Sequence, residues 1–84
     1  MIIELTTKSG ATFWLDKDLM TWSKQIDKRY TSGRLHLWPP SLSVGKSVTI
    51  FQTDKSSKLG LPFMTSPIIT MREIKRDEPN SAAV

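Results

Sequence analysis

The stretch "IIELTTKSGATFWL", residues 2–15, has the pattern of a β-hairpin and decides the predicted fold. Apolar and polar residues alternate in both of its halves, which is the period of a strand with one buried face. The apolar face consists of Ile3 and Leu5 in the first half, then Phe13 and Leu15 in the second. Between the halves, Ser9 and Gly10 suit a tight turn. We therefore expect two antiparallel strands that share one apolar face.

Turn residues separate four further segments that we predict to be strands. These are a strand through Met20 and Trp22 after a polar turn at residues 16–18, then residues 34–38, 47–52 and 66–74. Residues 24–33 show no clear period, and we expect a long loop there, with at most one short helix near residues 24–30. Residues 53–62 are expected to form a second loop.

This number of short strands in a chain of 84 residues indicates an all-β fold. A single flat sheet would leave one face and two edges bare, whereas a curled sheet or two packed sheets cover them. We predict one small domain over residues 1–76, a curled barrel or sandwich of the SH3-like or OB-like kind. Residues 77–84 have nothing to bury and are expected to be a disordered tail.

Alternation within the predicted strands also assigns the core. The side chains expected to be buried on a common face are Ile3, Leu5, Phe13, Leu15, Leu35, Leu37, Val48 and Ile50. Trp22 is expected on the core side together with Met20. The strand at residues 34–38 should end at Pro39 and Pro40, because proline has no N–H to donate to a sheet.

The same alternation turns a second set of side chains outward. Exposed aromatic and arginine side chains are typical of contact sites. We therefore predict a protein-contact surface formed by Trp14, Arg34, His36, Trp38 and Phe51. In the alternative arrangement, the loops at residues 24–33 and 53–66 fold over these aromatics as a second apolar cluster.

Patterns of catalytic and metal-binding residues are missing from the sequence. There is no cysteine, and the single histidine, His36, has no partner for a metal site and no nucleophile in a recognisable motif. "VGKS", residues 44–47, ends like a phosphate-binding loop, but Pro40 stands where that motif requires glycine. We predict that the protein is not an enzyme and uses no cofactor or metal.

Net charge and hydropathy limit the location and the partners. The formal charge of +4 is compatible with nucleic-acid binding but is common among small soluble domains. The N-terminus lacks a signal-peptide pattern, and no apolar run approaches the ~20 residues of a membrane span. We expect a cytoplasmic protein that does not bind membranes.

Three segments carry a family resemblance. "IELTTKSGATFWLDKDLMTW" at residues 3–22, "VGKSVTI" at 44–50 and "TSPIITMREI" at 65–74 resemble small accessory proteins of actinobacterial phages, mycobacteriophages in particular. The shared features are strand and turn signals over roughly two-thirds of the chain, so the resemblance supplies no catalytic or binding residues. What it implies is a phage accessory protein in the cytoplasm of an infected bacterium.

Three functions remain open at this point. The first is a non-enzymatic module that contacts a host or phage protein, or a second copy of itself. The second is a nucleic-acid-binding barrel in which the outward aromatics stack on bases. Its phosphate contacts would come from Lys24, Lys28, Arg29, Arg34 and Lys46. The third is a minor component of the virion. Aromatic and basic residues do not interleave along one strand, which favours the first function over the second.

Overall fold

The computed structural model describes residues 1–53 and 60–75. This part of the chain is all-β and contains no helix, which confirms the predicted fold class. Its strands are β1 (Ile2–Thr7), β2 (Thr12–Asp16), β3 (Thr21–Ile26), β4 (Arg29–Leu35), β5 (Thr49–Ile50), β6 (Gln52–Thr53), β7 (Phe63–Met64) and β8 (Ile68–Ile74). The predicted tail at residues 77–84 and most of the predicted loop at 53–62 lie outside the described residues.

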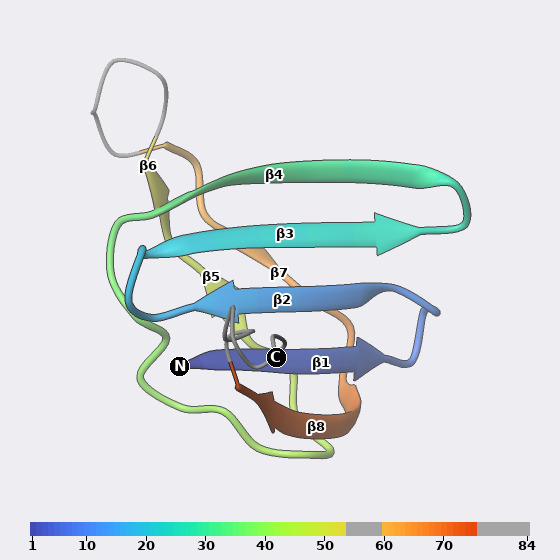
Figure 1. Ribbon diagram of the computed structural model, residues 1–84. Helices are drawn as coiled ribbons and strands as arrows, with labels where there is room; N and C mark the ends of the chain where they lie inside the picture. The colour runs from blue at the N-terminus through green and yellow to red at the C-terminus, as the bar shows by residue number, and fades with distance from the viewer. Residues whose placement is uncertain (54–59, 76–84) are drawn as a thin grey trace, which may run out of the picture.

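Two antiparallel sheets form two layers (Figure 1). The larger sheet has the strand order β6-β4-β3-β2-β1-β8, and the smaller one pairs β5 with β7. Figure 1 shows the small sheet behind β2 and β3. Among the described strands the large sheet is not closed, since its order begins at β6 and ends at β8. The arrangement is an open, sandwich-like stack with one sheet face turned inward and one outward.

The first hairpin forms as its sequence predicts. β1 and β2 pair with Ile3 opposite Leu15 and Leu5 opposite Phe13, which places these four residues on one face. Gly10 closes the turn at φ +92, a left-handed conformation that glycine adopts without steric cost, and its N–H donates to the carbonyl of Thr7. Burial of the shared face then fixes the register, because a slip by one residue would expose it.

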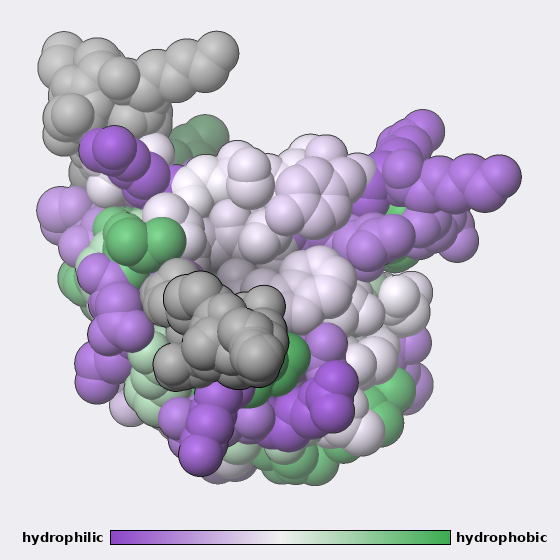
Figure 2. All heavy atoms as spheres, viewed as in Figure 1, coloured by the Kyte–Doolittle hydropathy of each residue, from purple (hydrophilic) through white to green (hydrophobic). Residues whose placement is uncertain are grey.

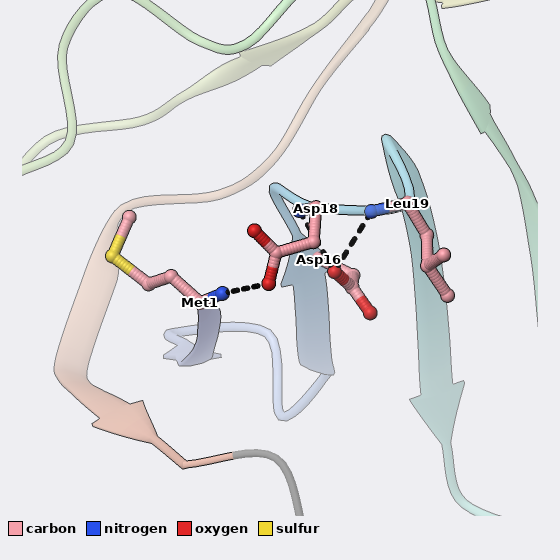
Figure 3. Close-up of polar contacts among 4 residues, drawn as sticks. All are labelled: Met1, Asp16, Asp18 and Leu19. Carbon is pink, nitrogen blue, oxygen red and sulfur yellow. Dashed lines mark hydrogen bonds and ion pairs between the residues drawn. The ribbon is translucent and has the colours of Figure 1, made fainter.

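A side chain organises the turn between β2 and β3 (Figure 3). The Oδ1 atom of Asp16 accepts hydrogen bonds from the backbone N–H groups of Asp18 at 3.0 Å and Leu19 at 3.1 Å. Such a turn is characteristic of aspartate, whose short carboxylate reaches the backbone ahead of it. The N-terminal amino group forms an ion pair with Asp18, which ties the start of β1 to the same turn. The polar turn predicted at residues 16–18 is confirmed.

Aromatic side chains join the two sheets in the core. Phe63 of β7 packs edge-on against Trp22 of β3, with ring centroids 5.1 Å apart. It also stacks on Phe13 of β2, with ring centroids 6.4 Å apart. Trp22 lies directly against Gly33 on the neighbouring strand, where an added Cβ would come within 2.8 Å of the indole nitrogen. The absence of a side chain at Gly33 therefore makes room for the buried indole.

Most of the predicted core is buried. Its buried members are Leu5, Phe13, Leu15, Leu35, Val48 and Ile50, and Ile3 packs against them while partly buried. Trp22 is buried as expected. The prediction for Leu37 is wrong, because 41% of this side chain is exposed. The strand that should have turned it inward ends at Leu35, so the alternation no longer applies beyond that residue.

The segment predicted as a loop, residues 24–33, forms a second hairpin instead. β3 and β4 pair continuously from Thr21–Arg34 to Ile26–Arg29, and Asp27 turns the chain at φ +54. The predicted helical turn is absent from this segment. The expected strand at residues 34–38 is therefore the end of a strand that begins at Arg29. Both faces of the hairpin carry polar residues, so its sequence does not show the alternation of apolar and polar residues that indicates a strand.

The predicted strands after Pro40 are shorter than expected. The segment at residues 47–52 splits at Phe51, so that β5 joins the small sheet while β6 pairs with Arg34 and Leu35 of β4. β7, which pairs with β5, had no predicted counterpart. The last predicted strand is confirmed as β8, which starts two residues later than expected. Its pairing with β1 contains a register shift between Thr6 and Thr7.

Candidate contact surface

The outer face of the large sheet, defined as the face opposite β5 and β7, is the candidate site. No other described strand lies in front of β1 to β4 in Figure 1. Since Leu5, Phe13 and Leu15 point inward, the alternate residues of each strand point outward. The central outer-face residues are Glu4, Thr6, Thr12, Trp14, Ser23, Gln25, Tyr30, Ser32, Thr70 and Arg72. Hydroxyl and aromatic groups thus dominate this face.

Figure 2 views this face directly. Pale residues of intermediate hydropathy occupy its centre over β2, β3 and β4, and purple hydrophilic residues lie mostly at its rim. Tyr30 is 64% exposed, whereas Trp14 is half-buried. Aromatic residues such as these two are enriched in the cores of protein interfaces.

Trp14 has a fixed place on the outer face because a glutamate holds its indole. Trp14 Nε1 donates to Glu4 Oε2 at 3.0 Å, and Arg72 Nε donates to Glu4 Oε1 at 2.6 Å. The three residues lie directly opposite one another on β2, β1 and β8. The hydrogen bond from Arg72 is the main cause that holds the pKa of Glu4 below its ordinary value. Partial burial of the carboxylate opposes that change, while the Trp14 hydrogen bond and the Arg72 charge add to it.

The outer face has little net charge. Its two arginines are Arg72, which forms an ion pair with Glu4, and Arg34, which lies on β4 opposite Thr21. The lysine of β3 lies on the other face, where Lys24 Nζ is 5.7 Å from the centroid of the Phe13 ring. Among residues 1–53 and 60–75, a polyanion would therefore find Arg34 as the one arginine of this face that forms no ion pair with a described residue, and no row of cations.

The structure does not bring the predicted contact residues together. Trp14 and Arg34 lie on the outer face, but β3 separates their strands. His36 is exposed beyond the end of β4, and its backbone N–H donates to the carbonyl of Phe51 at 2.6 Å. Phe51 is partly buried and lines a shallow hollow of about 190 Å³ with Pro40, Ser41, Ser47, Val48 and Thr49.

The outward orientation predicted for Trp38 is wrong. Trp38 is partly buried and packs against the hydrophobic core, with Lys17 Nζ 5.7 Å from the centroid of its ring. The prediction assumed a strand through residue 38, but β4 ends three residues earlier. The segment that follows is free to turn the indole toward the core, so Trp38 is removed from the candidate contact surface.

The predicted phosphate-binding residues are also dispersed. Lys24, Lys28 and Arg29 lie toward the turn of the β3–β4 hairpin, where Asp27 adds an opposite charge. Arg34 lies at the other end of β4. Lys46 belongs to the segment before β5, and its carbonyl accepts a hydrogen bond from Ile68. These five cations do not form one continuous track.

Tyr30 is the contact candidate that the sequence analysis missed. It was assigned to the predicted loop at residues 24–33, whereas the structure places it on β4 opposite Gln25. The sequence pattern that indicates it is the spacing of Tyr30 and Ser32, which lie two residues apart and therefore share one face of an extended strand. This pattern is weak because the opposite face of the same strand carries no row of apolar residues.

Metal-binding clusters and membrane-spanning helices are both missing from the described residues. Within residues 1–53 and 60–75, no group of three or more histidine, cysteine, aspartate or glutamate residues could hold a metal ion. In the same part of the chain, no helix has the length and hydropathy needed to cross a membrane. Comparison with protein-family models, curated proteins and solved structures gives no match to this chain.

Proposed function

We propose that the chain is a non-enzymatic interaction module that binds another protein through the outer face of its large sheet. The observation that supports this proposal is the composition of that face, which sets Trp14 and Tyr30 among serine and threonine side chains. Tyrosine and tryptophan give rigid amphipathic contact area at a low cost in conformational entropy, and small hydroxyl residues adapt to the partner's polar groups. Trp14 and Tyr30 are the proposed anchors.

Charge favours a protein partner over a nucleic acid. Nucleic-acid affinity depends on cations that neutralise phosphates. On the outer face Glu4 already neutralises Arg72, and the cations Lys28 and Arg29 lie at the hairpin turn, away from Trp14. A partner that matches this face presents polar and aromatic groups with little net charge.

The phage resemblance supports a particular biological setting for the contact. We propose that the protein is an accessory phage protein that acts in the cytoplasm of an infected bacterium, on a host or phage protein. A role as a minor virion component would use the same outer face on a structural partner. Self-association is tested separately, by the elution volume of the isolated chain in size-exclusion chromatography.

Affinity capture from a nuclease-treated actinobacterial lysate tests the proposal. The bait is the immobilised chain in four forms: the parent, Trp14→Ala, Tyr30→Ala and the double variant Lys28→Ala/Arg29→Ala. We expect one identifiable protein to be retained by the parent and by the double variant. Each aromatic variant should weaken binding of the purified partner roughly 30-fold, the effect of losing an interface anchor worth about 2 kcal/mol. Circular dichroism melts establish that every variant remains folded.

Salt and nuclease distinguish the two partner classes. A contact anchored by apolar and aromatic groups should persist from 50 mM to 200 mM salt, whereas binding to ~6–10 phosphates would weaken by roughly 10³–10⁵ over that range. The proposal would be overturned if the partner is retained only from a lysate without nuclease treatment and if its retention depends on Lys28 and Arg29. That result would support the nucleic-acid hypothesis.

A further inference from the structure

We infer that Glu4 and Arg72 are positioning residues that fix the indole of Trp14 in its binding orientation before a partner arrives. This inference rests on the proposed function, since it assigns Trp14 the role of an anchor. It goes further by naming two residues that act on the contact through Trp14. The geometry that supports it is the chain of hydrogen bonds across β2, β1 and β8.

The hydrogen-bond chain leaves the indole one favoured orientation. Glu4 uses one carboxylate oxygen for the indole N–H and the other for Arg72, so the two contacts constrain the same side chain from opposite sides. The Glu4 side chain is only 21% exposed, whereas that of Arg72 is 71% exposed. Shielding of the carboxylate strengthens its hydrogen bonds relative to those of a fully solvated ion pair. The indole ring is therefore held at its polar edge, while part of its surface stays exposed on the outer face.

Preorganisation of this kind improves binding without adding a contact to the partner. A mobile aromatic side chain must give up its rotamer freedom when it becomes an anchor, and that loss weakens the complex. In the present arrangement the folding of β1, β2 and β8 has already fixed the ring. Arg72 does not contact Trp14 directly in the described hydrogen-bond chain, so any effect of Arg72 on the indole must pass through Glu4.

Protonation of Glu4 should weaken its hold on the indole at low pH, because the hydrogen bond is then no longer charge-assisted. The charged and titratable groups that share the outer face with Glu4 on the two neighbouring strands are Arg72 on β8 and Asp16 on β2. Because the folded-state pKa of Glu4 is lowered, the network is intact at neutral pH and is lost only as the pH falls below the ordinary glutamate range. Asp16 is the hydrogen-bond acceptor of the turn that follows β2.

Nuclear magnetic resonance of the ¹⁵N-labelled full chain tests the inference without a partner. The chain has three tryptophans, and the Trp14 indole N–H signal is assigned by its disappearance in Trp14→Phe. We expect Glu4→Ala to make the Trp14 indole N–H exchange with water about tenfold faster, the loss of one charge-assisted hydrogen bond. Its heteronuclear NOE should fall as well. Arg72→Gln should produce a smaller change in the same direction.

Matched controls keep the result interpretable. Glu73→Gln removes a carboxylate from the exposed part of β8, next to Arg72 in sequence, and should leave the Trp14 signal unchanged. Glu4→Gln retains an oxygen acceptor for the indole and should restore part of the protection. A pH titration should move the Trp14 signal in the parent but not in Glu4→Gln. The indole signals of Trp22 and Trp38 report whether the fold is intact.

The outcomes separate this inference from the proposed function. If the Trp14 indole exchanges equally fast in the parent, Glu4→Ala and Arg72→Gln, the positioning role is overturned, even where partner capture depends on Trp14. If the indole responds as expected but Trp14→Ala retains the partner at full strength, the contact function fails. The positioning of the ring then stands without a role in binding.

Discussion

The two hairpins of the large sheet differ in what holds them, and the difference explains which one the sequence reveals. The β1–β2 hairpin packs Leu5, Phe13 and Leu15 into the core, so each of its strands alternates between apolar and polar residues. The β3–β4 hairpin buries Trp22 near its base, while most of β4 is exposed on both faces. Apolar and polar residues alternate along a strand only when one of its faces is buried. A hairpin that is exposed on both faces therefore shows no such alternation in its sequence.

The largest expected effect lies in the β1–β2 hairpin. Leu15 is fully buried between the sheets. Leu15→Ala should lower the free energy of unfolding by about 2–5 kcal/mol, because it removes packed methyl groups and leaves a cavity. Urea denaturation followed by circular dichroism measures the change.

The matched control is Leu37→Ala, which makes the same chemical change at a side chain that is 41% exposed. It should cost less than about 1 kcal/mol, since little packing is lost. Equal losses in the two variants would show that Leu37 is buried after all and that β4 continues past Leu35.

The next effect concerns the base of the β3–β4 hairpin. Gly33→Ala should destabilise the fold by roughly 1–3 kcal/mol, because its Cβ would meet the indole of Trp22 and force the ring to shift. Ser32→Ala, one residue away on the outer face, should be nearly neutral. Urea melts give the energies, and a changed Trp22 emission maximum reports the shifted ring. A neutral Gly33→Ala would mean that the indole does not lie over this glycine.

A smaller effect is expected for the ion pair between Glu4 and Arg72. At neutral pH, Glu4→Gln should cost no more than about 1 kcal/mol, because Arg72 is exposed and water screens the pair. The pKa of Glu4 is lowered in the folded state, so this stability is present above its unfolded pKa and lost as the pH falls through the folded value. Urea melts of parent and variant should therefore converge as the pH falls below the ordinary glutamate range. If the difference in the free energy of unfolding between parent and variant stays constant with pH, the ionised pair is not its cause.

The smallest effect is expected at the turn of the β3–β4 hairpin. Lys28→Gln and Arg29→Gln should change the free energy of unfolding by less than about 0.5 kcal/mol, since both side chains are exposed. Thermal melts of the two single variants measure this. A loss as large as that of Gly33→Ala would show that these cations have structural partners at the turn.

Sequence reasoning predicted the elements that bury apolar side chains. It found the first hairpin, the Asp16 turn, the last strand and the buried positions Val48 and Ile50, since each follows from alternation or from turn chemistry. It missed β4 before Arg34 because Tyr30, Thr31 and Ser32 are all exposed and give no apolar period. It misplaced Leu37 and Trp38 for a related reason, since alternation cannot show where a strand ends.

The candidate site was predictable only in part. The outward orientation of Trp14 follows from the parity of β2, and the structure adds Glu4 and Arg72 as its neighbours on β1 and β8. Arg72 is 68 residues from Glu4 along the chain, and only the strand order brings the two together. Pairing between distant strands is set by tertiary packing, which local patterns do not encode.

The outer face of the large sheet is the surface on which we propose that this protein meets its partner. Chemical-shift mapping tests it directly, by adding the captured partner to the ¹⁵N-labelled chain and recording which signals move. We expect the changes to centre on Glu4, on the backbone and indole of Trp14, and on Tyr30. Changes confined to Lys28 and Arg29 at the hairpin turn, or to the small sheet of β5 and β7, would contradict it.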